Sequence, residues 1–176
     1  MNKIDNNRNF IAVNICVLTI SDTRTTKNDK SGELLCKKIS LSKHYVYEKK
    51  IVKDDIELII KQIDNWSNID KVDVIITTGG TGLTGRDSTP EAIIKIADKI
   101  IDGFGELFRQ VSYEKIGSSS IQSRALGAIY KGKFIFSLPG SSSACKDAWD
   151  EILVNQLDNR FRPCNFIELM PRLKEK

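Results

Sequence analysis

Residues 71–92 read KVDVIITTGGTGLTGRDSTPEA, and this segment decides the fold of the chain. Its first part, residues 72–76, is a short apolar run rich in β-branched side chains, which is typical of a strand buried on both faces. Four glycines follow within residues 79–85. Ser88 and Glu91 then have capping-box spacing, which marks the start of a helix. The segment therefore predicts a strand, a glycine loop and a helix in succession.

The glycine loop has the properties of an anion-binding site. Glycine allows positive φ and close approach of the backbone, so such a loop is able to turn its N–H groups toward an anion. The helix that starts near Ser88 would point its positive end at the same place. We therefore interpret the loop as a cradle for a phosphate or a nucleotide.

The loop matches neither of the common nucleotide motifs well. Gly80, Gly82 and Gly85 formally satisfy G-x-G-x-x-G, but a dinucleotide fold has this motif after its first strand, with the helix opening at the third glycine. A P-loop would have Lys and then Ser or Thr after Gly85, where this chain has Arg86 and Asp87. Asp87 is either a magnesium ligand beside a phosphate or a helix cap, and the spacing leaves both open. Arg86 either contacts phosphate or faces solvent, and we favour solvent because Arg is usually exposed.

Size and composition are those of one globular domain. The chain has 176 residues, of which 40% are hydrophobic and 28% charged. No apolar run approaches the length of a membrane span. The net charge of +4 suits small anionic ligands, but the lysines are scattered and form no nucleic-acid patch. We expect a flexible tail at residues 1–9, a single domain at 10–170 and a C-terminal tail at 171–176.

The cysteines and the single histidine exclude some site classes. The four cysteines lie far apart and form no C-x-x-C pair, so a zinc site is not expected, and we predict a cytoplasmic protein with reduced thiols. His44 falls in a polar turn, and we do not propose it as a base. No Ser-His-Asp or Cys-His arrangement can be assembled, so no protein nucleophile is expected.

Strand and helix patterns alternate along the rest of the chain. Apolar runs predict strands at 10–20, 45–52, 121–130 and 133–138, with a hairpin turn at Lys131-Gly132. Apolar residues at helical spacing predict helices through 35–39, 56–66, 93–101, 104–111 and 145–153, and Trp66 is expected in the core.

Polar residues mark several junctions between these elements. Ser31 and Asp54 are candidates to cap the helices that follow them. Asp22 comes just after a predicted strand, where α/β sheets place ligands, although a turn-capping role is the commoner one. The serines after Pro139-Gly140 cap a helix, bind an anion, or both, and capping is favoured.

The segment 77–92 resembles the MoaB/Mog family of molybdenum cofactor biosynthesis. The likeness extends through most of the chain, at Leu18-Thr19-Ile20-Ser21-Asp22, Ser31-Gly32, Gly103-Phe104-Gly105-Glu106, Ser123-Arg124 and Leu138-Pro139-Gly140-Ser141. Residues 157–166, LDNRFRPCNF, look like the MoaB branch in particular.

The resemblance implies a three-layer α/β/α sandwich with a mostly parallel sheet, assembled as a homotrimer or homohexamer. It implies adenylyl transfer from ATP to molybdopterin with Mg²⁺, giving adenylylated molybdopterin and pyrophosphate. Other proteins of the same pathway are then possible partners.

The resemblance also assigns roles to residues. Asp54 and Asp87 match the family's acidic positions and would be the catalytic pair that holds Mg²⁺. The substrate-binding residues would be Ser21, Asp22, Gly79, Gly80, Thr81, Gly82, Ser88, Pro139, Gly140, Ser141 and Ser142.

Three other functions remain as alternatives. A pterin-binding protein without catalysis would keep the cradle and lose the chemistry. A nicotinamide-linked oxidoreductase would use the formal glycine motif. An oligomeric scaffold would use the apolar face around Phe104 and Phe108, but would leave the glycine loops without a role.

Overall fold

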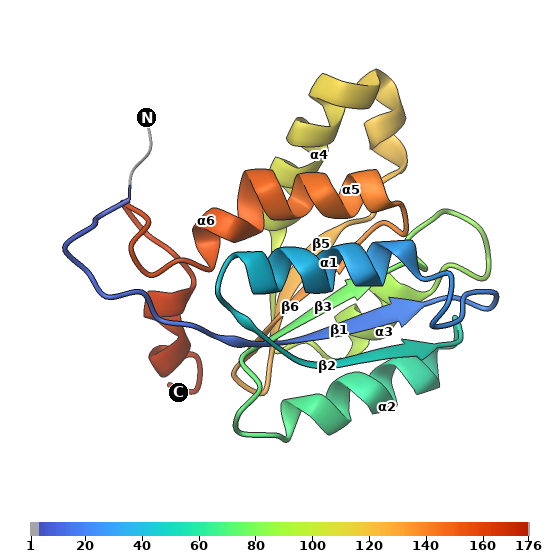
Figure 1. Ribbon diagram of the computed structural model, residues 1–176. Coiled ribbons are helices and arrows are strands. Elements are labelled where there is room, and N and C mark those ends of the chain that lie inside the picture. Colours follow the sequence, from blue (N-terminus) through green and yellow to red (C-terminus); the bar gives the residue numbers. More distant parts are fainter. Residues whose placement is uncertain (1–3, 176) are drawn as a thin grey trace.

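Six strands form one sheet in the order β2-β1-β3-β6-β5-β4 in the computed structural model, which describes residues 4–175 (Figure 1). The strands β2, β1, β3 and β6 are parallel neighbours, whereas β5 and β4 join antiparallel at one edge. The mostly parallel α/β sheet predicted from the sequence is confirmed. The strands are β1 (Asn14–Ile20), β2 (Tyr45–Val52), β3 (Val74–Thr78), β4 (Lys99–Ile101), β5 (Leu126–Tyr130) and β6 (Lys133–Leu138).

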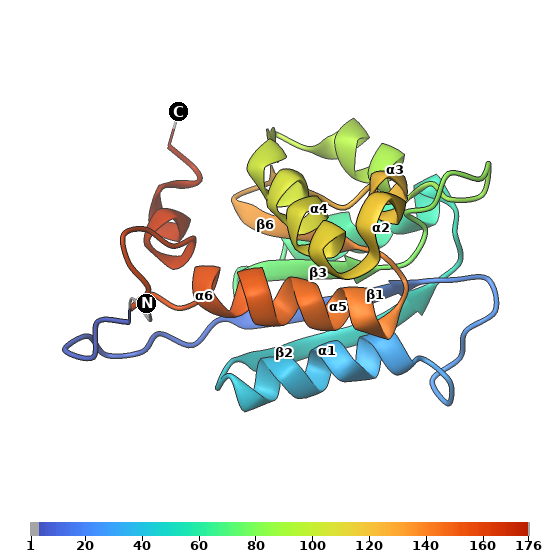
Figure 2. The same cartoon turned by 90° about the horizontal axis from the view of Figure 1, so that it is seen from above.

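Helices cover both faces of this sheet (Figures 1 and 2). The α-helices are α1 (Lys30–Leu41), α2 (Ile56–Ser67), α3 (Thr89–Ile96), α4 (Asp102–Ile116), α5 (Ser142–Asp147) and α6 (Val154–Gln156). The 3-10 segments are η1 (Gly117–Gln122) and η3 (Ile167–Arg172), and the π-helical segment η2 (Ala148–Leu153) continues α5. Within residues 4–175, no helix is both long and apolar enough to cross a bilayer.

The central strands supply both cores because successive side chains of a strand point to opposite faces. In β1, Ile15 and Val17 face α1 and α5, while Cys16 and Leu18 face α2. Every residue of β3 and β6 is buried, and all of them are apolar or carry a hydroxyl except Lys133, whose Nζ donates to the carbonyls of Asp70 and Val72. Trp66 is 1% exposed, so its prediction as a core residue is confirmed.

The predicted helix over 93–101 is wrong at its C-terminal end. The helix α3 ends at Ile96, Ala97 turns extended, and Lys99–Ile101 pairs antiparallel with β5 as an edge strand. The isoleucines keep helical spacing beyond Ile96, but pairing with β5 decides the backbone there. The predicted strand over 121–130 is likewise shorter, because its first residues belong to η1.

Two predicted helix caps belong to neighbouring residues. The helix α1 is capped by Asp29, whose carboxylate accepts from the N–H of Gly32, and Ser31 is buried in the first turn. The helix α2 is capped by Asp55, which accepts from the N–H of Leu58, and Asp54 is free for another contact.

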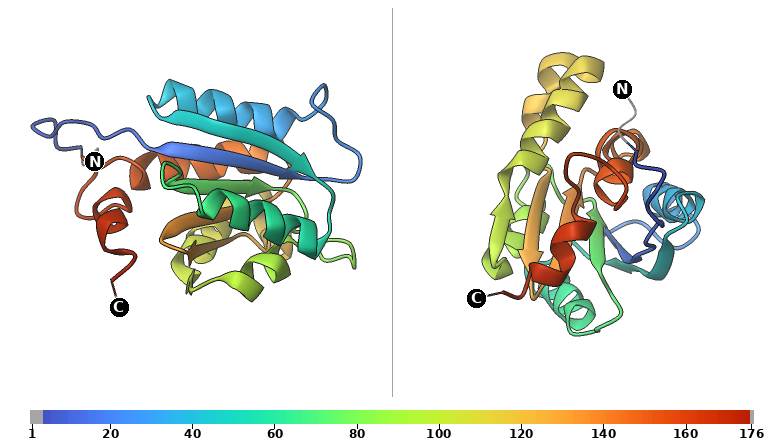
Figure 3. Two further views of the ribbon diagram at one scale, coloured as in Figure 1. Left: turned by 90° about the horizontal axis from the view of Figure 1, so that it is seen from below. Right: turned by 90° about the vertical axis from the view of Figure 1, so that its left-hand side faces the viewer.

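The N-terminal and C-terminal segments lie on the same side of the molecule, where β1 begins (Figures 2 and 3). Of the predicted N-terminal tail, residues 1–3 lie outside the described residues. The next ones contact the C-terminal segment, since the N–H of Asp5 donates to the carbonyl of Arg160 (2.9 Å) and Arg8 donates to the carbonyl of Asn159 (2.7 Å). Phe166 packs on the ring of Phe134 at 4.8 Å. The C-terminal segment therefore braces the far edge of the sheet and does not cover the glycine loop.

Candidate functional site

Three loops meet at the carboxyl ends of β1, β3 and β6, the edge where parallel sheets bind ligands (Figure 1). They begin at Ser21, Gly79 and Pro139. The N–H of Gly79 donates to the carbonyl of Leu138 (3.1 Å), and the N–H of Ser21 donates to the carbonyl of Val52 (2.9 Å). The glycine loop follows the third strand along the chain, so the nicotinamide alternative lacks the first-strand placement that it requires.

Glycine is required at the start of the loop for steric reasons. Gly79 and Gly80 have φ of +103° and +62°. A Cβ on Gly79 would lie 2.2 Å from the carbonyl oxygen of Ile20, and one on Gly80 would lie 2.3 Å from the Oγ1 of Thr89. The start of the loop is therefore pressed between the end of β1 and the first turn of α3.

The glycine loop and the Pro139-Gly140 loop touch through their backbones. A Cβ on Gly140 would lie 3.3 Å from the Cα of Gly79. Thr78 links the loops because its hydroxyl donates to the carbonyl of Pro139 (3.1 Å). Ser141 accepts from the N–H of Ala144 (3.2 Å), which confirms the favoured capping role for this serine.

A cavity of about 410 Å³ opens between these two loops, within the size range of small-molecule sites. Its opposite wall comes from α4 and η1, where the apolar Phe108 and Ile116 lie beside Ser112 and Gln122, and no sequence pattern indicated this wall. Eight of the predicted site residues line it: Gly79, Gly80, Thr81, Gly82, Asp87, Pro139, Gly140 and Ser141. The wall and floor are completed by Phe108, Ser112, Ile116, Gln122, Ser123 and Ala144.

Asp87 does not cap the helix, so that alternative is wrong. Its Oδ2 accepts from the N–H of Thr84 (3.0 Å) and from the hydroxyl of the same residue. The hydroxyl of Thr84 is the main cause that lowers the pKa of Asp87 below its usual value, so the carboxylate is ionised at neutral pH. Asp87 also lines a second, adjacent cavity with Leu83 and Ser88.

Asp54 and Ser88 lie behind the glycine loop. The Oδ1 of Asp54 accepts from the N–H (3.1 Å) and from the hydroxyl (2.7 Å) of Ser88. The predicted capping box is therefore wrong, because the hydroxyl of Ser88 is taken by Asp54 and Glu91 pairs with Arg124. The other oxygen of Asp54 lies 2.6 Å from the position of a Cβ on Gly80, so this carboxylate borders the loop from outside the cavity.

The remaining predicted residues surround the cavity without lining it. Ser21 accepts from the N–H groups of Thr23 and Arg24, at 3.2 Å each, and so shapes its own turn. Asp22 forms an ion pair with Arg86 (2.7 Å), which ties the β1 loop to the glycine loop. The Arg86 side chain is 76% exposed, in line with the favoured solvent-facing prediction. Ser142 opens α5 beside the cavity.

Two arginines that the residue patterns did not single out as site residues hold the loops. Arg24 donates to the carbonyl of Gly140 (2.6 Å) and to the hydroxyl of Ser31. Arg124 donates to the carbonyls of Gly82 (2.8 Å) and Asp87 (2.7 Å). These contacts span 116 and about 40 residues, so no local spacing reveals them.

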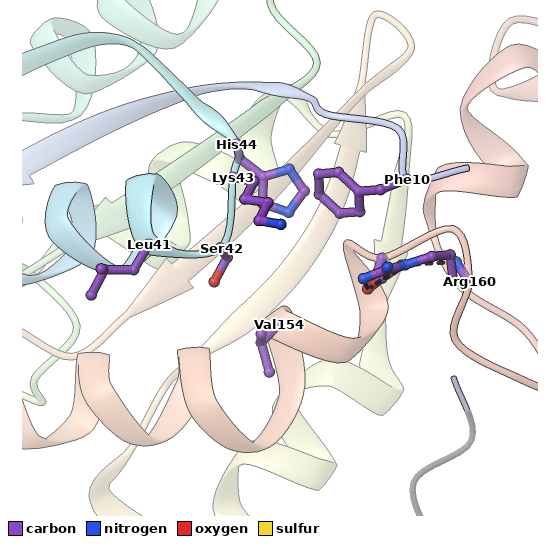
Figure 4. Close-up of a pocket in the computed structure, with 8 residues that line it drawn as sticks. Phe10, Leu41, Ser42, Lys43, His44, Val154 and Arg160 are labelled. Carbon is purple, nitrogen blue, oxygen red and sulfur yellow. Dashed lines mark hydrogen bonds and ion pairs between the residues drawn. The ribbon is translucent and has the colours of Figure 1, made fainter. Parts of the chain in front are cut away.

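A separate cavity of about 240 Å³ lies at the opposite edge of the sheet, between the end of α1 and the C-terminal segment (Figure 4). Arg160 there pairs with Asp158 (2.8 Å) and lies over the ring of Phe10. His44 lies between the turn at Ser42-Lys43 and β2, as predicted, but its side chain is buried, at 4% exposed. Burial lowers the pKa of His44 to about 4, so the imidazole is neutral at neutral pH. It lines this separate cavity and not the one at the glycine loop.

The comparisons with known proteins agree with this geometry. The family model described as "Probable molybdopterin binding domain" matches residues 16–159. The chain is 43% identical over 166 residues to Molybdenum cofactor biosynthesis protein B of Escherichia coli K12, covering 94% of this chain and 96% of that protein. It is 47% identical over 142 residues to the protein of the same name from Bacillus cereus, covering 80% and 84%.

Solved structures show the same fold. A crystal structure of a molybdenum cofactor biosynthesis protein B matches with a TM-score of 0.84 at 40% identity, covering 94% of this chain and 98% of that one. The tungsten cofactor synthesizing protein MoaB from Pyrococcus furiosus matches with a TM-score of 0.77 at 33% identity, covering 93% and 98%. This chain therefore belongs to the molybdopterin-binding domain family and is, within it, like molybdenum cofactor biosynthesis protein B.

Proposed function

We propose that this protein binds molybdopterin and ATP and transfers the adenylyl group to the terminal phosphate of the pterin, releasing pyrophosphate. The observation that carries the proposal is the 410 Å³ cavity itself. One side is a glycine backbone at the N-terminus of α3 with the ionised Asp87, and the other is the apolar wall of Phe108 and Ile116. A polar end for phosphates beside an apolar wall suits a ligand with a phosphate at one end and a ring system at the other.

The residues act by position and charge. Phosphoryl-type transfer depends on aligning the attacking and leaving oxygens, and the terminal phosphate of the pterin is itself the nucleophile. The protein therefore needs no nucleophilic side chain. The backbone N–H groups near Gly80 and Gly82 and the positive end of α3 would hold the phosphate oxygens, and the Pro139-Gly140 loop would fix the other substrate.

The two carboxylates would hold a magnesium ion shared with a triphosphate from different sides, Asp87 from the cavity and Asp54 from behind the glycine loop. Each commits one oxygen to the loop, Oδ1 of Asp54 to Ser88 and Oδ2 of Asp87 to Thr84. Among residues 4–175 no group of three or more His, Cys, Asp or Glu is placed to hold a metal alone. Mg²⁺ usually takes one or two carboxylates together with substrate phosphates, so a complete protein cage is not needed. When bound, the ion would neutralise charge on the phosphates.

The proposal is tested by pyrophosphate release from the full chain with ATP, Mg²⁺ and molybdopterin, beside the variant Asp87→Asn. The variant keeps most of the Thr84 contact and should fold normally, because the side-chain oxygen that accepts is retained. We expect loss of turnover by about two orders of magnitude or more, as for removal of one group that stabilises transition-state charge. Chelation of Mg²⁺ should abolish release in the wild type. Wild-type turnover by Asp87→Asn would remove this residue from the mechanism.

A second candidate function is pterin binding without catalysis. It is favoured by the same hydrogen bonds, since Asp54 and Asp87 already hold Ser88 and Thr84 and so have structural roles of their own. Tight molybdopterin binding with no pyrophosphate release from the wild type would establish this function instead.

We also propose that the chain assembles as a homotrimer or homohexamer through the edge that carries β4. The isoleucines Ile94 and Ile100 are 57% and 41% exposed there, beside a cavity of about 350 Å³ that is lined by both apolar and charged side chains. An exposed edge strand with apolar side chains is usually covered in the functional state.

A further inference from the structure

Arg124 closes the exposed part of the glycine loop. Its Nε donates to the carbonyl of Gly82 (2.8 Å) and its Nη2 donates to the carbonyl of Asp87 (2.7 Å). Its Nη1 pairs with the carboxylate of Glu91 in the first turn of α3. One guanidinium thus joins the two ends of the exposed part of the loop, Gly82 and Asp87, to the helix α3 that follows.

Apart from the exposed ion pair of Arg86 with Asp22, the segment between these anchors has little other support. Leu83 is 67% exposed, and a Cβ on Gly85 would meet nothing within 4 Å. The turn is closed on itself by the bonds between Thr84 and Asp87. Without an anchor outside the segment, this turn would move as a unit and carry the carboxylate of Asp87 with it.

The guanidinium suits this role better than another cation would. Arginine presents its donors in a rigid planar fork, so several carbonyls can be held at fixed angles. The Arg124 side chain is only 26% exposed, which strengthens its charge-assisted hydrogen bonds relative to a solvated pair. The positive charge also lies beside Asp87 and favours its ionised form.

We propose that Arg124 is a positioning residue for the reaction, holding the carboxylate of Asp87 at the place where the phosphates react. The inference rests on the proposed adenylyl transfer. The hydrogen bonds of Arg124 go to the glycine loop and to Glu91, and Arg124 does not line the cavity beside Phe108, Ile116 and the Pro139-Gly140 loop, so pterin binding should depend on it little. Loss of Arg124 therefore affects turnover more than binding.

The test compares four variants of the full chain. Arg124→Ala removes the fork, and Arg124→Lys keeps the charge without it. Glu91→Gln removes only the ion pair with Glu91 and leaves both carbonyl contacts in place. Arg172→Ala is the control, since Arg172 is 68% exposed and pairs, among residues 4–175, with nearby Glu175 in the C-terminal segment.

Each variant is measured in three ways: the kcat for pyrophosphate release, the Kd for molybdopterin, and hydrogen exchange of the backbone amides. For Arg124→Ala we expect kcat to fall about tenfold or more, which corresponds to loss of hydrogen bonds to a charged group. The Kd should change far less, and exchange should speed up at residues 82–88 but not in β1 or β3. Free guanidinium at a non-denaturing concentration should restore part of the turnover. The kcat of Arg124→Lys should lie between those of Arg124→Ala and wild type, and the kcat of Glu91→Gln should be close to that of wild type.

The outcomes separate this inference from the proposed function. If wild type turns over and Arg124→Ala matches it, Arg124 is not a positioning residue. If kcat, the affinity for molybdopterin and stability fall together and guanidinium rescues nothing, the role of Arg124 is only structural, and the inference is again overturned. If wild type releases no pyrophosphate, the proposed function fails. Hydrogen exchange then tests the inference alone. Faster exchange at residues 82–88 in Arg124→Ala supports the view that Arg124 holds this segment in place, and unchanged exchange refutes it.

Discussion

Replacing Gly79 with alanine should be among the most damaging single changes in this protein. The residue has φ of +103°, and an added Cβ would lie 2.2 Å from the carbonyl oxygen of Ile20. The left-handed backbone alone costs about 1–2 kcal/mol for a residue with a Cβ. The contact is with backbone at the end of a buried strand, so it cannot be relieved by rotating a side chain. We therefore expect Gly79→Ala to lower the free energy of unfolding by about 3 kcal/mol or more.

Gly85→Ala provides a matched control in the same loop. Gly85 has no φ in the left-handed region, and a Cβ there would meet nothing within 4 Å. Alanine should be neutral there or stabilising by about 0.4–1 kcal/mol, because it restricts the unfolded chain. Urea unfolding followed by circular dichroism gives both values at one temperature and pH.

The comparison tests whether steric pressure dictates the glycines. If the Gly79→Ala and Gly85→Ala variants unfold at the same urea concentration, the backbone at Gly79 relaxes freely, and the account of a loop pressed against β1 is refuted. If Gly79→Ala is destabilised as expected, molybdopterin binding should weaken too, because Gly79 also contacts Gly140 of the opposite loop.

Two further predictions concern the edges of the sheet. Burial lowers the pKa of His44 to about 4 from its usual 6.5, although the charge of Asp158 opposes this, so the unfolded chain binds the proton more readily. Stability should therefore fall by about 3 kcal/mol as the pH drops from 6.5 to 4, and His44→Asn, which keeps an acceptor for Val13, should remove this slope in urea titrations at each pH. Ile100→Asp should leave the monomer folded but reduce the mass seen by light scattering, whereas Leu41→Asp, 72% exposed at the other edge, should not. An unchanged mass for Ile100→Asp would exclude the β4 edge as the interface.

Most of the sheet could be predicted because its strands carry their own signal. The run at 45–52 has the same bounds as β2, and the hairpin at Lys131-Gly132 joins β5 and β6 as expected. The edge strand β4 could not be predicted, since its three residues continue the helical spacing of α3 and only pairing with β5 distinguishes them. Where a local pattern fits two structures, tertiary pairing decides.

The site could be predicted only where local sequence patterns mark its residues. Glycine spacing marks the loop at 79–85, and Asp87 stands out because a carboxylate beside a phosphate cradle requires a partner. The wall from α4 and the contacts of Arg24 and Arg124 join segments far apart in sequence, so spacing holds no information about them. Asp54 illustrates the intermediate case: its position was noted, but its contact with Ser88 required the fold.

These long-range contacts have a common consequence for catalysis. Arg24 fixes the Pro139-Gly140 loop, Arg124 fixes the glycine loop, and the two loops meet at Gly79 and Gly140. A transfer reaction that depends on alignment of its substrates is accelerated most when the binding loops need little rearrangement after the substrates bind. Both loops are fixed against each other in the free protein, so the substrates would be aligned by binding itself. A mutation at Arg24 should therefore be felt at the glycine loop, through the Gly79–Gly140 contact, whereas the effect of Arg124 variants should stay within residues 82–88.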